Sequence, residues 1–142
     1  MGEMICTFKV PGDPFGKQRP RHTKSGHTYT PEETRRHELA VGWAYRQQCG
    51  AMRFAPEDQI EISVVAFYAI PKRATKAQRE KMLCGEVRPT VKPDWDNIGK
   101  LICDALNGVA YDDDKCVVQA TVSKWYSDDP SVVVTLKRTV VR

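Results

Sequence analysis

The sequence predicts an α/β fold, arranged as one compact domain over residues 1–142. Three observations support this prediction. A chain of 142 residues has the size of a single domain that can bury a hydrophobic core. Segments that alternate like strands are interspersed with segments whose apolar residues recur at helical spacing. No internal repeat or low-complexity linker divides the chain.

The first strand is predicted over Ile5–Val10, where the alternation ends at the turn-forming residues 11–14. Residues 15–27 are basic and contain several glycines and prolines, which indicates an exposed loop. A long helix is then predicted from Thr30, as N-cap, to about Cys49. The apolar residues expected to be buried in this helix are Leu39, Ala40, Trp43 and Ala44.

The rest of the chain is predicted to alternate strands and helices. These elements are a strand over Ile60–Ile70, a short polar helix over Thr75–Leu83, a loop over 88–93, a central helix over 94–107, and strands over Val117–Trp125 and Val132–Arg138. Residues 127–130 are expected to join the last two strands as a hairpin. Trp43 and Trp125 are expected in the core. Trp95 is expected to pack as well, with stacking on an exposed base as the alternative.

Composition and cysteine spacing set broad limits on the class of protein. Hydrophobic residues make up 41% and charged residues 28%, as in globular proteins. The chain lacks a secretion signal and an apolar run long enough for a membrane span, so a cytoplasmic location is expected. The five cysteines show no Cys-x-x-Cys spacing, so neither a zinc site nor a disulfide framework is predicted.

The central helix is strongly amphipathic. Its apolar residues fall on one stripe, formed by Ile98, Leu101, Ile102, Ala105 and Leu106. Asp96, Lys100 and Asp104 follow one another at i, i+4 and i+8 on the opposite face. Asp94 lies at the N-terminal end, where free backbone N–H groups favour a carboxylate. Charged residues on such a face are usually only solvated, so further observations are needed to assign them a function.

A second acidic group, residues 112–114, follows shortly after this helix and can fold back toward it. Clustered carboxylates repel one another unless a cation holds them together. Carboxylate oxygens without nearby histidine or cysteine suit Mg²⁺, or Mn²⁺ in its place, rather than zinc. Such an ion can activate water for phosphodiester hydrolysis. Lys100 can then offset substrate charge or orient the water.

Two other metal motifs were compared with this segment. An EF-hand loop beginning at Asp94 fails, because Ile98 and Ala105 stand where ligands are required. The restriction-nuclease pattern of Pro-Asp followed by Asp-x-Lys is matched by Pro93-Asp94 and by residues 113–115. That pattern normally has its Asp-x-Lys on a core strand, whereas residues 113–115 lie in a polar turn. The match is weak, although it also indicates a metal-dependent nuclease.

The net charge of +4 is modest, but basic residues lie in two groups around the acidic centre. This distribution suits a protein that binds phosphates and holds a cation between them. The candidate DNA-binding residues are Lys17, Arg19, Arg21, Lys24, Lys72, Arg73 and Lys76.

With these residues in view, the sequence resembles the RusA family of Holliday-junction resolvases, found in prophages and their bacterial hosts. The resemblance is strongest in the Asp-x-Asp-Asn-x-x-Lys motif over 94–100, in Asp104-Ala-Leu, and in the acidic residues after Tyr111. Residues 11–14, 17–21 and 29–31 and Lys124 also match, so that the resemblance covers nearly the whole chain.

The resemblance implies that Asp94, Asp96 and Asp114 bind the metal and act in catalysis, with Lys100 as the essential lysine. The loop before Tyr111 is one residue shorter than in some relatives, so Asp113 is the alternative third carboxylate. The resemblance also implies a mixed β-sheet packed with helices, a homodimer, Mg²⁺ dependence, and paired symmetric nicks across four-way DNA. Two alternatives stay open: a catalytically silent DNA-binding protein, and a nuclease for other branched or flapped nucleic acids.

Overall fold

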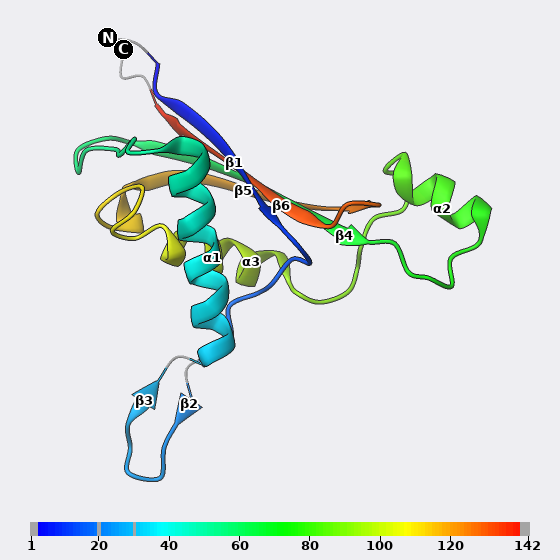
Figure 1. Cartoon of the computed structure of the whole chain (residues 1–142), viewed down its shortest axis with the longest axis horizontal. Helices are drawn as coiled ribbons and strands as arrows, with labels where there is room; N and C mark the ends of the chain where they lie inside the picture. Colours follow the sequence, from blue (N-terminus) through cyan, green and yellow to red (C-terminus); the bar gives the residue numbers. More distant parts are fainter. Residues whose placement is uncertain (1–2, 20, 30, 140–142) are drawn as a thin grey trace.

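A four-stranded mixed sheet forms the centre of the fold (Figure 1). The structure is a computed structural model that describes residues 3–19, 21–29 and 31–139. The strands are β1 (Ile5–Pro11), β4 (Ile60–Ala69), β5 (Val117–Ser127) and β6 (Ser131–Arg138), in the order β1-β6-β4-β5. β6 pairs antiparallel with both β1 and β4, whereas β4 and β5 are parallel. This mixed sheet, together with the helices, confirms the predicted α/β class.

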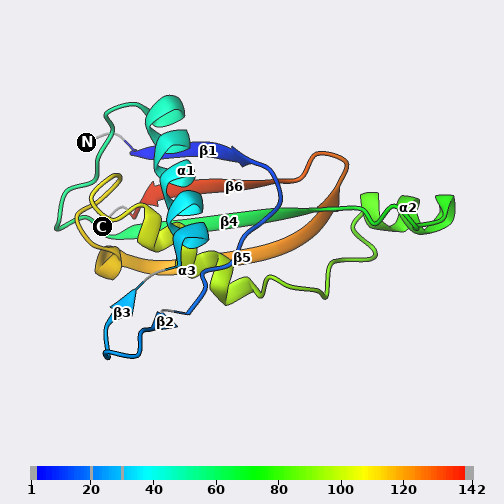
Figure 2. The same cartoon turned by 60° about the horizontal axis from the view of Figure 1, so that its bottom comes forward.

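Two helices, α1 (Glu32–Cys49) and α3 (Trp95–Ala105), cover the same face of the sheet (Figures 1 and 2). Alternate residues of β4 point toward them and are buried, including Ile62, Val64 and Tyr68. Apolar burial of this kind contributes roughly 25 cal/mol per Å². The apolar stripe of α3 is buried as predicted, since Ile98, Leu101, Ile102, Ala105 and Leu106 are all at most 9% exposed.

The position of α3 follows from the direction of the strands. Parallel strands cannot be joined by a tight turn, so the chain between β4 and β5 must cross from one end of the sheet to the other. That crossover contains α2 (Lys76–Leu83), α3 and the short 3₁₀ helix η1 (Asp114–Cys116). A Cβ atom on Gly99 of α3 would lie 3.2 Å from Val122 of β5, so the helix lies close over this edge strand.

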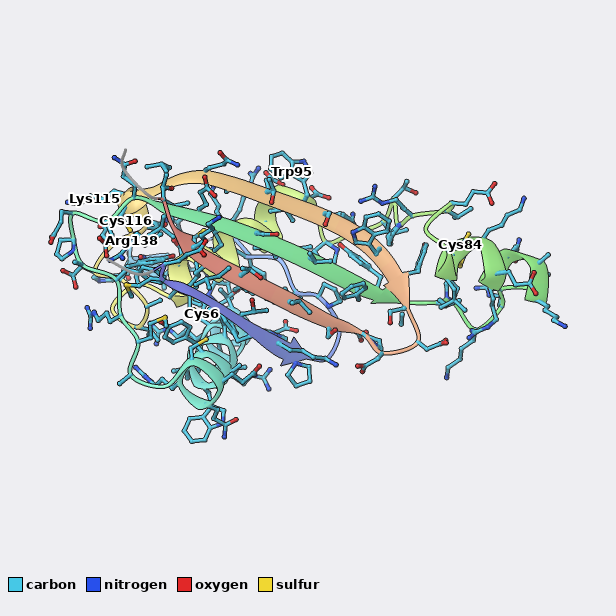
Figure 3. All side chains as sticks on the ribbon, turned by 90° about the horizontal axis from the view of Figure 1, so that it is seen from above. Cys6, Cys84, Trp95, Lys115, Cys116 and Arg138 are labelled. Atoms are coloured by element: carbon cyan, nitrogen blue, oxygen red, sulfur yellow. The ribbon has the colours of Figure 1, made fainter. Side chains whose placement is uncertain are left out.

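The helix α2 extends beyond the end of the sheet (Figures 1 and 2). Figure 3 shows Cys84, the C-cap residue of α2, beyond the end of the strands. The N-terminus of α2 forms a capping box, in which the side chains of Thr75 and Gln78 each accept a hydrogen bond from the other's backbone N–H. No residue of α2 is buried, so this predicted helix is present as an exposed arm.

The predicted hairpin between the last two strands is wrong. β4 lies between β5 and β6 in the sheet, so these two strands do not pair with each other. Their connecting turn instead passes across the end of β4. Local turn residues predict a reversal of the chain, but they do not show whether a third strand has already taken the central place.

The predicted buried face of α1 is partly wrong. Ala44 is buried, but Leu39 is 74% and Trp43 is 63% exposed, and Ala40 is exposed as well. The buried residues of α1 are instead Thr34, Val41, Gly42, Ala44 and Tyr45. Two of these carry hydroxyl groups, and both hydroxyls find hydrogen-bond partners in the structure. This polar content concealed the buried stripe in the sequence.

The other tryptophans also differ from the prediction. Trp95 is 62% exposed, so its expected packing is wrong, and Trp125 is only partly buried. The predicted loop over 15–27 contains most of a small ribbon, in which β2 (Arg21–His22) pairs with β3 (Thr28–Tyr29). The predicted N-cap Thr30 lies outside the described residues, and the helix begins after Pro31.

Side chains contact both edge strands of the sheet. At β1, the amide of Gln48 accepts from the backbone N–H of Lys9 at 2.8 Å and donates to its carbonyl at 2.7 Å. At β5, Arg88 donates to the carbonyl of Lys124 at 2.9 Å. None of the helices in the described ranges combines the length and apolar character needed to cross a membrane.

A matched pair of leucine variants tests the assignment of the core. Leu106→Ala is expected to lower the free energy of unfolding by roughly 2–5 kcal/mol, because this side chain is fully buried. Leu39→Ala is expected to change it by less than about 0.5 kcal/mol, because Leu39 lies in solvent. Urea unfolding followed by circular dichroism measures both. Similar losses for the two variants would contradict the observed orientation of α1.

Candidate active site

The candidate active site begins at the N-terminus of α3. Asp94 is the N-cap residue, and its carbonyl accepts from the N–H of Ile98 at 3.1 Å. Its backbone is extended, and its carboxylate makes no capping hydrogen bond. The sequence indicated that helix N–H groups would engage a carboxylate here, and the structure shows no such bond. The carboxylate of Asp94 is therefore not used in holding the helix end.

The loop that leads to Asp94 is attached to two strands. The hydroxyl of Tyr68 on β4 donates to the carbonyl of Pro93 at 2.5 Å. The ammonium of Lys124 on β5 donates to the carbonyl of Val91 at 2.6 Å and lies 5.0 Å from the Tyr68 ring centroid. Burial, and secondarily the negative charge of Asp94, raise the pKa of Tyr68 to about 12, which keeps this hydroxyl a donor at neutral pH.

On the other side of β5, Arg88 stacks on Trp125 with its guanidinium carbon 3.6 Å from the ring centroid. A Cβ on Gly85 would lie 2.9 Å from the same ring. The segment before α3 therefore contacts the edge strand β5 through several side chains. These contacts fix where Asp94 enters the helix.

A second segment, residues 14–18, lies against the start of α3. A Cβ on Gly16 would lie 2.9 Å from Cβ of Pro93 and 3.0 Å from Cβ of Asn97. The backbone N–H of Lys17 donates to the carbonyl of Asn97 at 2.9 Å. Only glycine lets the backbone approach this closely, so Gly16 brings the basic segment against the acidic helix.

Between these segments lies a pocket of about 400 Å³. Acidic and basic side chains share its walls. Its lining residues are Lys17, Gln18, Arg19, Asp94, Asp96, Asn97, Lys100 and Asp104. The structure thus brings Asp94, Asp96 and Lys100 to one pocket, together with two residues predicted to bind DNA.

Asp114 lies at the start of η1, which Asp113 caps by accepting from the N–H of Lys115 at 2.9 Å. The N–H of Asp114 donates to the side chain of Asn107, just after α3, at 2.9 Å. Asp114 is thus folded back toward the helix, as predicted. Its carboxyl contacts Asp104, and burial together with the neighbouring carboxyls of Asp113 and Asp104 raises the pKa of Asp114.

The pKa of Asp113 is lowered by its hydrogen bond from the backbone of Lys115. This carboxylate is therefore engaged as a cap, while Asp114 faces the helix. The same placement bears on the restriction-nuclease pattern, because residues 113–115 form a cap and a 3₁₀ turn rather than a core strand.

Asp114 and the Asp94–Asp96 pair are not brought together. Asp114 does not line the pocket, and Asp104 lies between the two acidic groups. Figure 3 shows Trp95 well apart from Lys115 and Cys116. Among residues 3–19, 21–29 and 31–139, no group of three histidine, cysteine, aspartate or glutamate side chains is placed to hold a metal ion. The donor chemistry nevertheless fits Mg²⁺, which commonly uses one or two carboxylates and keeps several waters.

The predicted DNA-binding residues fall into three places. Lys17 and Arg19 line the pocket, but the ammonium of Lys17 pairs with Asp104. Lys24 lies in the turn of the β2–β3 ribbon, and the side chain of Arg21 is outside the described part. Lys72, Arg73 and Lys76 lie on or just before the α2 arm.

Asp104 is the charged residue of the pocket that was not among the predicted site residues; the uncharged Gln18 and Asn97 were not among them either. Asp104 was recognised as part of the polar face of the helix, eight residues after Asp96, but not as a member of the site. Its distinguishing features are its partners, Lys17 and Asp114, which come from segments distant in sequence. The i+8 spacing is the signal that could have found it.

Comparison with known proteins agrees with this geometry. Residues 11–137 match the family described as Endodeoxyribonuclease RusA. The chain belongs to the RusA endodeoxyribonuclease family. It is also 34% identical over 139 residues to a protein of Bacillus subtilis (strain 168) described as uncharacterized protein YqaN, covering 92% of this chain and 94% of that protein.

Two glycine variants test whether the close approach of residues 14–18 builds the site. Gly16→Ala is expected to cost roughly 1–3 kcal/mol of unfolding free energy, because the new methyl meets Pro93 and Asn97. Gly42→Ala in α1 is the control, since its nearest neighbour would lie 3.8 Å away. It is expected to be neutral or to stabilise by up to about 1 kcal/mol. Equal stability of Gly16→Ala and the wild type in thermal unfolding would contradict the tight contact.

Proposed function

We propose that this chain is a Mg²⁺-dependent endodeoxyribonuclease that resolves four-way DNA junctions by paired symmetric nicks. The observation that supports this most directly is the pocket in which Asp94 and Asp96 lie opposite a basic segment, in a member of the RusA family. Hydrolysis of a phosphodiester requires neutralisation of phosphate charge and a hydroxide near neutral pH.

In this proposal Asp94 and Asp96 would hold Mg²⁺. The third carboxylate implied by the family resemblance, Asp114 with Asp113 as its alternative, lies outside the pocket that these two line. When bound, the ion would supply Lewis-acid charge and an activated water. Mn²⁺, which also takes oxygen ligands, can replace it. The ammonium of Lys100, one helical turn from Asp96, offsets negative charge on the phosphate undergoing attack. The guanidinium of Arg19, in the same pocket, binds a phosphate oxygen of the strand.

The α2 arm and the β2–β3 ribbon extend the proposed DNA-binding surface away from the pocket. From Pro71 to Arg88 the chain has six basic and two acidic residues. In the described residues no carboxylate pairs with Lys72, Arg73 or Lys76, so these side chains are available for phosphates. An exposed basic arm beyond the sheet can reach a duplex that leaves the cleavage point.

A homodimer completes the proposal. A four-way junction has two-fold symmetry and must be cut on two opposed strands. Two copies of this chain, related by the same symmetry, would place one pocket at each strand. Cytoplasmic location and a prophage or host role in recombination and repair stay predictions.

A binding protein without catalysis is the second candidate. It is favoured by one observation: the structure gives no ready group of three metal-binding side chains within its described residues. A nuclease for other branched or flapped nucleic acids would share the chemistry and differ only in substrate.

Cleavage of a synthetic four-way junction, compared with linear duplex of equal length, tests the function. We expect symmetric nicks in the junction alone, with Mg²⁺, and none with a chelator. Asp96→Asn is expected to lower the rate at least about 100-fold, because a metal-binding oxygen is lost. Asp129→Asn, an exposed carboxylate in the β5–β6 turn, is the matched control and should cut normally.

Each outcome separates the candidates. Equal cutting of linear duplex would retain the nuclease and reject the junction assignment. Tight junction binding without cutting in Mg²⁺ or Mn²⁺ would establish the binding protein. Full activity in Asp96→Asn would reject the proposed metal site.

Salt dependence tests the α2 arm. Each phosphate contact contributes about 0.9 to the slope of log affinity against log salt. Replacing Lys72, Arg73 and Lys76 together by alanine is therefore expected to reduce the slope by about 2 to 3 in fluorescence-anisotropy titrations with Ca²⁺ in place of Mg²⁺. Lys137→Ala on β6, where the lysine is paired with Glu3, is the control. An unchanged slope in the triple variant would exclude the arm from DNA binding.

A further inference from the structure

The ion pair between Lys17 and Asp104 differs from the others in the described residues. The side chains of Lys17 and Asp104 are 23% and 28% exposed. In the remaining pairs, such as Lys9–Asp129 at 48% and 71%, both partners are at least 42% exposed. Exposed pairs contribute little, whereas removal of one partner from a more buried pair leaves an uncompensated charge. Lys17 is therefore not an ordinary surface lysine.

The backbone that carries Lys17 is held in place from two sides. Gly16 packs against Pro93 and Asn97, and the N–H of Lys17 donates to the carbonyl of Asn97. The next N–H, that of Gln18, donates to the hydroxyl of the fully buried Thr34 at 3.4 Å. Because this backbone is fixed, the ammonium of Lys17 can occupy only a limited region around it. Its ammonium meets Asp104 on α3.

Asp104 has a second charged neighbour, the acidic residue Asp114, so a cation beside Asp104 would reduce the repulsion between the two carboxyl groups. The carboxyl of Asp114, which does not line the pocket, neighbours that of Asp104, so two acidic groups from different elements meet at Asp104. Like charges so close are stabilised by an opposite charge beside them. Within the described structure that charge is the ammonium of Lys17.

We propose that Lys17 is a positioning residue of the active site, whose ammonium holds the Asp104 carboxylate at the wall of the pocket shared with Asp94 and Asp96. Lys17 is thus committed to an internal partner and is not a DNA phosphate contact, unlike its neighbour Arg19. This proposal rests on the proposed function, because positioning matters only if the pocket cuts DNA.

The experiment combines cleavage rates with the salt slope of junction binding in Ca²⁺. Lys17→Met is expected to lower kcat about 10- to 100-fold, the range for residues that orient catalytic groups, with KM nearly unchanged. Lys17→Arg keeps the charge and should recover most of this loss. Lys9→Met, which removes the exposed lysine paired with Asp129, is the matched control and should cut as the wild type does.

Binding gives a readout that does not depend on catalysis. Lys17→Met should leave the salt slope unchanged, whereas Arg19→Ala should reduce it by about 0.9. Asp104→Asn, which preserves the side-chain shape, should release Lys17 to bind phosphate and steepen the slope by about 0.9. The double variant Lys17→Met with Asp104→Asn should lose that gain.

Several results would overturn the proposal. A drop of about 0.9 in the slope of Lys17→Met, with normal kcat at saturating DNA, would make Lys17 a phosphate contact. If Asp104→Asn left the slope of log affinity against log salt unaltered, the ion pair with Asp104 would not be what keeps Lys17 from binding phosphate. If the wild-type chain cuts no DNA, the proposed function fails, and the positioning role fails with it. The binding measurements would then still decide whether Asp104 holds Lys17. If Lys17→Met does not fold, the salt slope of Asp104→Asn alone answers this question.

Discussion

The parallel pairing of β4 with β5 is the constraint on which the rest of the structure depends. It obliges the chain to return to the far end of the sheet before β5 can begin, and α3 lies on that return path. Burial of its apolar stripe presses the helix onto the sheet and leaves Asp96, Lys100 and Asp104 on the other side. The charged face is therefore oriented by the core, and its residues need no contacts of their own to hold the helix.

Around this helix the site is assembled from segments that are distant in sequence. The segment after β1 contributes Lys17 through the close approach of Gly16, and η1 contributes Asp114 through Asn107. The strands contribute Tyr68 and Lys124, which hold the loop before Asp94. The wall of the pocket carries both acidic and basic side chains, and Asp104 pairs with Lys17 across it. A negatively charged substrate that enters the pocket would therefore lie next to side chains of both charges rather than of one sign alone.

Much of this could be predicted from the sequence, and the parts that could not share a physical reason. The amphipathic pattern of α3 predicted both its buried residues and its polar face, because a single period determines the two together. The buried face of α1 was missed, since Thr34 and Tyr45 belong to it while the apolar Leu39 and Trp43 lie in solvent. The order of the strands and the pairing of Lys17 with Asp104 depend on contacts between remote segments, which local patterns do not encode.

The side chains that contact the edge strands have a consequence for self-association. An open sheet edge can recruit another strand, and this is a common route to aggregation and to continuous sheets across two subunits. Here Gln48 occupies both hydrogen-bonding groups of Lys9 on β1, and Arg88 occupies the carbonyl of Lys124 on β5. At Lys9 and Lys124 these backbone groups are therefore not free to pair with another strand. Two copies of the chain would have to associate through side-chain surfaces there, and neither sheet could be extended by the other without first displacing these caps.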